Sequence, residues 1–154
     1  MTSDLCRILL TSEQIHERIR ALAAEIADTY RGQDTGLTLV PILSGSIIFT
    51  ADLIRELPLK MKIALMQLST YPGRSTTPQA PRVVMELNGD IRGRHVLLID
   101  DILDTGRTLR AVQRLLHDRG PASLRTAVLL RKPAKAPPDV LADRRGLSSR
   151  PRRP

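Results

Sequence analysis

The sequence is poor in the residues that build disulfide frameworks, aromatic binding surfaces and membrane spans. Its 154 residues contain one cysteine, Cys6, which excludes an internal disulfide and fits a reducing cytosol. Tryptophan is absent and the aromatic residues are Tyr30, Phe49 and Tyr71, which argues against a stacking platform for single-stranded nucleic acid. No apolar run approaches the length of a membrane span, and the first residues lack the pattern of a secretory signal. We therefore expect a cytoplasmic protein with one domain and a substantial core.

Positive charge is in excess but is unevenly distributed. The formal net charge is +8, yet residues 144–154 contain five arginines and no acidic residue, which leaves +3 for the remainder. Composition thus predicts a domain over residues 1–143 and a basic, disordered tail over residues 144–154. A solvated tail is the simpler interpretation, and an electrostatic contact with RNA or DNA is the alternative.

Apolar periodicity predicts strands that alternate with helices. Thr11 and Gln14 form a capping-box pattern ahead of a helix whose apolar residues recur at helical spacing, and Gly32 ends it. This alternation indicates an α/β fold with a mainly parallel, twisted sheet flanked by helices. Further helices are expected over residues 47–57 and 108–119, and strands over residues 7–10, 37–43, 62–68, 82–87, 96–99 and 124–130.

A long loop interrupts this pattern over residues 69–81. It contains three prolines, one glycine and many hydroxyl side chains, and a predicted strand flanks it on each side. Loops of this length are usually lids or disordered segments. The flanking strands favour an excursion from a hairpin, which makes a mobile lid hairpin the functional interpretation and simple disorder the alternative.

The most informative stretch is residues 96–108, where a fully apolar run meets clustered carboxylates. Four apolar residues, which indicate a buried central strand, lead to Asp100, Asp101 and Asp104. Open α/β sheets bind ligands at the carboxyl edge, and the small polar residues that follow begin a helix whose free N–H groups bind phosphate. One interpretation is a carboxylate site for a cation or sugar beside a phosphate cradle. The alternatives are a Mg²⁺ site that serves a different function and a solvated loop that binds no ligand.

A second loop of small residues follows the predicted strand 37–43. Gly45 within it would let backbone N–H groups approach an anion, although a tight strand-to-helix turn uses the same residues. In a doubly wound sheet the loops after Leu43, Ile99 and Leu130 share one edge. We therefore expect three polar loops to meet at one site.

These motifs resemble those of the type I phosphoribosyltransferases. The family signature is an apolar strand, two acidic residues, two apolar residues and then Asp-Thr-Gly with a nearby Thr, which residues 99–108 match closely. Within the family the chain is most similar to the hypoxanthine(-guanine) phosphoribosyltransferases, on residues 40–54, 68–71 and 129–133. The resemblance covers about residues 5 to 143 and implies a type I phosphoribosyltransferase fold.

The resemblance also implies a role for each part of these motifs. Asp100 and Asp101 match the acidic pair that holds the ribose hydroxyls and Mg²⁺, and Asp104 matches the general base near the purine N7. Lys132 matches the lysine that contacts the purine 6-oxo group, which disfavours adenine. The other matches are the 5′-phosphate loop (Asp104, Thr105, Gly106, Arg107, Thr108), the pyrophosphate loop, which often has a non-proline cis peptide (Leu43, Ser44, Gly45), and the mobile lid (Ser69, Thr70, Tyr71).

The implied activity is Mg²⁺-dependent transfer of the 5-phosphoribosyl group from phosphoribosyl pyrophosphate to hypoxanthine, guanine or both. This reaction releases pyrophosphate and forms IMP or GMP in purine salvage. The apolar faces of the predicted helices indicate a homo-oligomer, a dimer or a tetramer. Two other functions stay open: a nucleotide-sensing regulator that binds RNA or DNA through its basic tail, and a weakly active binder of phosphoribosyl pyrophosphate.

The chain departs from the family pattern at two places. Ser44 stands where the family often has Lys, at a position that acts largely through its backbone. The family also has a segment after the last strand that supplies an aromatic residue to stack on the purine and an Asp for the metal, whereas no aromatic residue follows Tyr71 here. This predicts a truncated or frame-altered C-terminus, purine affinity weakened roughly ten- to a hundredfold, and low turnover.

Overall fold

The computed structural model describes residues 10–33, 36–69, 82–85, 87–132 and 147–149. Strands and helices alternate along most of the chain, as the apolar periodicity predicts. In chain order the elements are α1 (Ser12–Tyr30), β1 (Leu37–Leu43), α2 (Ile47–Glu56), β2 (Met61–Ile63), β3 (Met66–Ser69), β4 (Arg82–Met85), β5 (His95–Leu103), α3 (Arg107–His117), β6 (Ser123–Arg131) and β7 (Leu147–Ser149).

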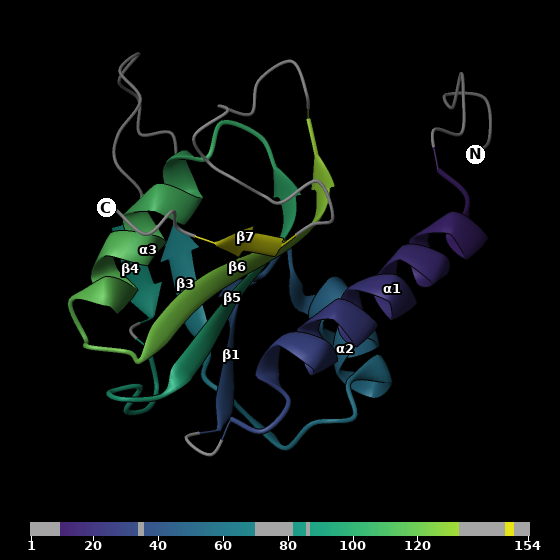
Figure 1. The fold of residues 1–154 in the computed structure, drawn as a ribbon. Coiled ribbons are helices and arrows are strands. Elements are labelled where there is room, and N and C mark those ends of the chain that lie inside the picture. Colours follow the sequence, from purple (N-terminus) through teal and green to yellow (C-terminus); the bar gives the residue numbers. More distant parts are fainter. Residues whose placement is uncertain (1–9, 34–35, 70–81, 86, 133–146, 150–154) are drawn as a thin grey trace, which may run out of the picture.

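The described elements form one central sheet with helices on both of its faces (Figure 1). The strand order is β4-β3-β1-β5-β6-β7, with β2 paired to β1. The central strands β1, β5 and β6 are parallel to one another, whereas β4 and β7 are antiparallel to their neighbours. The predicted α/β fold with a mainly parallel sheet is confirmed.

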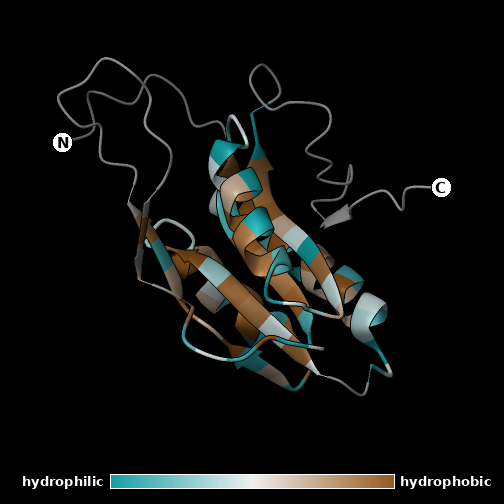
Figure 2. Cartoon of the chain, turned by 90° about the vertical axis from the view of Figure 1, so that its left-hand side faces the viewer, coloured by the Kyte–Doolittle hydropathy of each residue, from teal (hydrophilic) through white to brown (hydrophobic). Residues whose placement is uncertain are grey.

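Each face of the sheet has its own apolar core. On one face α1 and α2 pack on Leu39, Leu97 and Ile99, and on the other face α3 packs on Val40 and Leu98. Successive residues of a strand point to opposite faces, so a strand that is apolar throughout can bury both of its faces. Figure 2 shows hydrophobic residues along the central strands and hydrophilic residues on the outer helix surfaces.

The capping box at the start of α1 forms as predicted. The Thr11 N–H donates to Gln14 Oε1 at 2.8 Å, and the Gln14 N–H donates to Thr11 Oγ1 at 3.3 Å. Gly32 follows the helix with φ of 74°, a conformation that suits glycine. Within the described residues, none of the helices has the length and apolarity needed to cross a bilayer.

The strand predicted over residues 62–68 is two short strands. β2 and β3 keep one register on β1, since Leu39 pairs with Ile63 and Ile42 pairs with Met66. The division falls where Leu65 donates its N–H to Asn88 Oδ1 at 2.7 Å. Sequence periodicity does not reveal this contact because Asn88 belongs to a distant part of the chain.

Three other predictions concern the edges of the sheet. β3 and β4 are antiparallel, so the predicted hairpin is present, while its loop at residues 70–81 lies outside the described residues. Residues 7–9 of the predicted first strand also lie outside them. Residues 147–149 form β7 on β6, so the expectation of disorder is wrong at these three residues because the open edge of β6 offers backbone hydrogen bonds. The division into a domain and a tail stays a prediction.

Leu22 and Ile48 offer a matched test of the α1 interface. Leu22 is fully buried between α1 and the sheet, whereas Ile48 on α2 is 71 % exposed. Leu22→Ala should lower the free energy of unfolding by about 2–5 kcal/mol, because it removes buried methyl groups and leaves a cavity. Ile48→Ala should change it by less than about 0.5 kcal/mol in the same urea titration. Equal losses in the two variants would contradict this packing.

Candidate active site

Three strand ends and the loops after them form the carboxyl edge of the sheet. β1, β5 and β6 run in the same direction, with Pro41 paired to Ile99 and Leu103 paired to Arg131. Their ends therefore lie side by side, as the sequence predicts for a doubly wound sheet. Ser44 follows β1, Asp104 follows β5 and Lys132 follows β6.

Asp100 and Asp101 are part of β5 itself. The strand continues to Leu103, so both residues lie inside the last part of the strand and not beyond its end. The Asp101 N–H donates to Asp100 Oδ1 at 3.1 Å, and the Ile102 N–H donates to Asp101 Oδ1 at 2.8 Å. Burial, followed by the charge of the Asp101 carboxylate, raises the pKa of Asp100 from 3.8 to about 7.

The loop after β1 approaches this carboxylate pair closely. A Cβ atom built on Gly45 would lie 3.3 Å from Asp101 Oδ2 and 3.4 Å from Asp101 Oδ1. The Leu43–Ser44 peptide bond is cis, as the family resemblance implies. Ser46 is buried and donates its hydroxyl to the Ile42 carbonyl at 2.8 Å, which ties the loop back to β1. The predicted pyrophosphate loop and the acidic pair are thus brought together.

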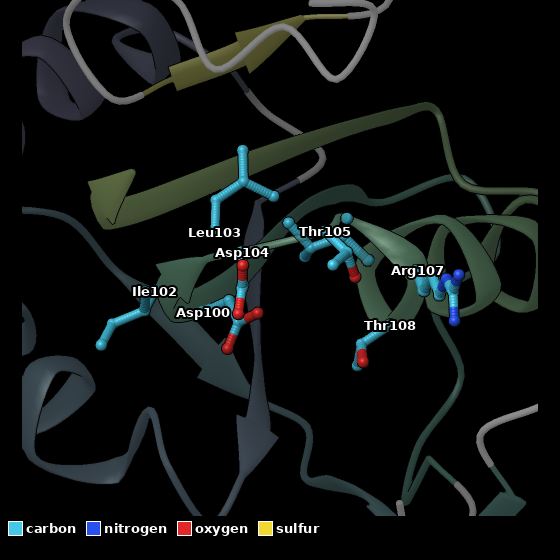
Figure 3. Close-up of a pocket in the computed structure, with 9 residues that line it drawn as sticks. Asp100, Ile102, Leu103, Asp104, Thr105, Arg107 and Thr108 are labelled. Atoms are coloured by element: carbon cyan, nitrogen blue, oxygen red, sulfur yellow. The ribbon is translucent and has the colours of Figure 1, made fainter. Parts of the chain in front are cut away.

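The loop after β5 surrounds a small cavity of about 80 Å³. Gly106 has φ of 73° and lies at the start of α3, so the loop turns into the helix with free backbone N–H groups. Such helix N-termini bind anions through those N–H groups and the helix dipole. Figure 3 shows Thr105 and Thr108 around the helix start and Arg107 directed away from Asp100. The lining residues are Asp100, Ile102, Leu103, Asp104, Thr105, Gly106, Arg107, Thr108 and Leu109.

Asp104 is paired with the lysine that follows β6. Lys132 Nζ lies 3.3 Å from Asp104 Oδ2, and the Lys132 N–H donates to the Leu103 carbonyl at 3.0 Å. The second carboxylate oxygen, Asp104 Oδ1, is buried and has no hydrogen-bond partner among the described residues. Asp104 and Lys132, the two residues predicted to contact the purine, therefore lie next to each other, and Asp104 lines the cavity.

One predicted part of the site lies mostly outside the described residues, and one residue of the cavity was not predicted from the sequence. Of the predicted lid, Ser69 ends β3, and Thr70 and Tyr71 lie outside the described residues. Ile102 lines the cavity and is 40 % exposed, although the apolar pattern gave no reason to assign it to the site. The sequence could have indicated Ile102 only through its position, because it lies between Asp101 and Asp104 of the signature.

The described residues contain no cluster of three or more His, Cys, Asp or Glu side chains that could hold a metal by themselves. Mg²⁺, however, is usually bound through one or two carboxylates together with substrate phosphates and waters. Asp100 and Asp101 supply two carboxylates beside an anion cradle, and their mutual repulsion would be relieved by a cation. The two carboxylates would therefore fit a divalent cation that is bound together with a phosphorylated ligand.

Comparison with protein families identifies the family of this chain. A family model described as the phosphoribosyl transferase domain matches residues 8–150. The chain therefore belongs to the phosphoribosyltransferases.

Curated relatives narrow this to one branch of the family. A hypoxanthine-guanine phosphoribosyltransferase of Mycobacterium avium is 42 % identical over 136 residues, covering 84 % of this chain and 66 % of the relative. A hypoxanthine phosphoribosyltransferase of Haemophilus influenzae is 40 % identical over 134 residues, covering 86 % of this chain and 75 % of the relative. Within the phosphoribosyltransferases the chain thus belongs with the hypoxanthine(-guanine) branch, a group of transferases.

Solved structures agree with this placement. A hypoxanthine phosphoribosyltransferase of Staphylococcus aureus superposes with a TM-score of 0.81 at 35 % identity, covering 90 % of this chain and 74 % of that one. A hypoxanthine phosphoribosyltransferase of Trypanosoma cruzi, solved in complex with the product IMP, superposes with a TM-score of 0.78 at 35 % identity over 88 % and 76 % of the two chains.

The raised pKa of Asp100 predicts how stability depends on pH without ligand or metal. Between pH 4 and about 7 the folded protein keeps a proton that the unfolded chain has lost, so the free energy of unfolding falls as pH rises through this window. The rise from 3.8 to about 7 corresponds to roughly 4 kcal/mol at most. Asp100→Asn should therefore be more stable than the native protein at pH 8 and similar to it near pH 4.

Urea titrations at several pH values in a chelator would measure this effect. The control is Asp118→Asn, which changes an exposed carboxylate at the end of α3. A stability difference for Asp100→Asn that stays constant from pH 4 to 8 would contradict the buried carboxyl.

Proposed function

We propose that this protein transfers the 5-phosphoribosyl group from phosphoribosyl pyrophosphate to hypoxanthine, guanine or both, with Mg²⁺ as cofactor. The products are pyrophosphate and IMP or GMP, as in purine salvage. The observation that carries the proposal is the meeting of three elements at one sheet edge: the Asp100–Asp101 pair, the cavity at the start of α3, and the Asp104–Lys132 pair.

The sugar-phosphate half of the site binds the donor. The backbone N–H groups of residues 105–108 at the start of α3 hold the 5′-phosphate, with the hydroxyls of Thr105 and Thr108 beside them. Asp100 and Asp101 hold the ribose hydroxyls and the Mg²⁺ ion. The pyrophosphate lies against the loop after β1, where Gly45 leaves room beside Asp101.

Bond breaking separates charge, and the site is arranged to stabilise both signs. As the bond from ribose C1 to pyrophosphate breaks, positive charge develops on the sugar and negative charge on the leaving group. The carboxylates favour the sugar charge, and backbone N–H donors near Gly45 favour the pyrophosphate. A Mg²⁺ ion held by Asp100 and Asp101 would add positive charge that offsets the charge of the leaving group. The predicted lid would exclude the water that otherwise hydrolyses the donor.

The base half of the site selects and activates the purine. The Lys132 ammonium donates a hydrogen bond to a 6-oxo group but meets another donor in a 6-amino group, so hypoxanthine and guanine are favoured over adenine. Asp104 accepts the proton that the purine loses near N7 as its ring nitrogen bonds to ribose C1. Asp104 lines the cavity, and Lys132 Nζ lies 3.3 Å from Asp104 Oδ2.

We also infer a cytosolic homo-oligomer. The single cysteine agrees with a reducing compartment. Ile47 and Ile48 on α2 are 49 % and 71 % exposed, which agrees with an apolar contact between copies.

An assay with five bases tests the reaction. The protein is incubated with phosphoribosyl pyrophosphate, Mg²⁺ and each of hypoxanthine, guanine, xanthine, adenine and uracil, and nucleotide formation is measured. We expect product with the 6-oxopurines and a rate lowered about 10²–10⁴-fold in Asp104→Asn, because the variant lacks the general base. Asp118→Asn should keep the native rate. No product with any base, together with salt-sensitive RNA binding that needs residues 144–154, would favour the regulator.

Thermal denaturation tests the metal requirement without relying on turnover. Phosphoribosyl pyrophosphate with Mg²⁺ should raise the midpoint of unfolding, since a ligand at 100 times its Kd stabilises by about 2.7 kcal/mol. EDTA or the substitution Asp101→Asn should remove most of this increase, whereas Asp118→Asn should retain it. A full increase in EDTA would contradict a metal-dependent donor site.

A further inference from the structure

Asp104 has one polar partner in the part of the chain that the structure describes. Its Oδ2 atom pairs with Lys132 Nζ at 3.3 Å, and its Oδ1 atom is buried without a hydrogen bond. The residue lies just after β5 and just before Gly106, which takes the left-handed conformation at the start of α3. No other described side chain therefore orients this carboxylate.

The backbone places Lys132 where it can hold Asp104. Leu103, the residue before Asp104, pairs with Arg131, the residue before Lys132, in the parallel ladder of β5 and β6. The ladder ends with the Lys132 N–H donating to the Leu103 carbonyl at 3.0 Å. The two side chains thus leave adjacent strands from fixed positions, and their contact depends on sheet register rather than on two freely moving side chains.

We propose that Lys132 is a positioning residue for Asp104, in addition to its own contact with the 6-oxo group of the base. The ammonium holds Oδ2 at the mouth of the site, so that the carboxylate faces the purine N7 with its acceptor oriented for proton transfer. The 6-oxo group and N7 are neighbours on one edge of the purine. A paired ammonium and carboxylate therefore presents a donor beside an acceptor, which is the pattern that this edge requires.

This inference rests on the proposed function and adds a separate claim to it. If Lys132 acted only on the 6-oxo group, its loss would leave a base without that group unaffected. If Lys132 also positions Asp104, its loss impairs every purine, because displacement of a catalytic group by about 1 Å can lower a rate about 10²-fold.

Unsubstituted purine, which has hydrogen at C6, separates the two roles. We expect Lys132→Met to lower kcat with this base by roughly ten- to a hundredfold, with a smaller change in its KM. Lys132→Arg should recover much of kcat, because a guanidinium can still pair with the carboxylate. In an Asp104→Asn background, Lys132→Met should have little additional effect on kcat with purine, because the group that it positions is already absent.

Lys60→Met is the matched control, because Lys60 is an exposed lysine outside the site. Circular dichroism and the unfolding midpoint identify any variant that fails to fold, and Lys132→Arg then provides the test. An unchanged kcat with purine in Lys132→Met, alongside a loss with hypoxanthine, would overturn the positioning role and leave the proposed function standing. Absence of product with any base in the native protein would instead reject the proposed function.

Discussion

The site depends on two carboxylates held at the end of a buried central strand. The apolar part of β5 is fully buried from Val96 to Ile99, and the next two residues are Asp100 and Asp101. Burial and the second negative charge make ionisation of Asp100 unfavourable, which raises its pKa to about 7. A cation and sugar hydroxyls would compensate for this arrangement. In the proposed reaction, ligand binding would therefore favour ionisation of Asp100.

The parallel register of the sheet turns this strand end into a site. Because β1 and β6 flank β5 in the same direction, the loop with Gly45 and the lysine at position 132 lie on either side of the carboxylates. Gly45 approaches Asp101 so closely that a Cβ would be in contact with it, and Lys132 pairs with Asp104. The donor side and the base side of the proposed reaction are therefore supported by different neighbouring strands, with β5 common to both.

The proposed purine-binding half of the site combines recognition of the purine with proton transfer in two side chains. Lys132 is assigned to the 6-oxo group and Asp104 to the proton near N7, and the ion pair joins these roles. An exposed ion pair adds little to protein stability, and these two side chains are 54 % and 41 % exposed. In the role we propose, the contact orients the carboxylate, which matters for catalysis more than for folding.

The sequence by itself determined the fold class and most of the helices and strands, and it predicted which residues would meet at the candidate site. Thr11 and Gln14 marked the first helix and the apolar runs marked the central strands, because each pattern reflects local physical chemistry. The residues from Asp100 to Thr108 predict a carboxylate and phosphate site, which stays a prediction. Only the tertiary structure decided the division of β2 from β3, where the Leu65 N–H donates to Asn88, and the addition of β7 to the edge of β6. It also decided the place of Ile102 in the cavity and the contact between Lys132 and Asp104. Each of these joins residues that are distant in the chain or depends on which face of an element meets a neighbour. Such contacts are set by sheet register and packing, which local periodicity does not encode.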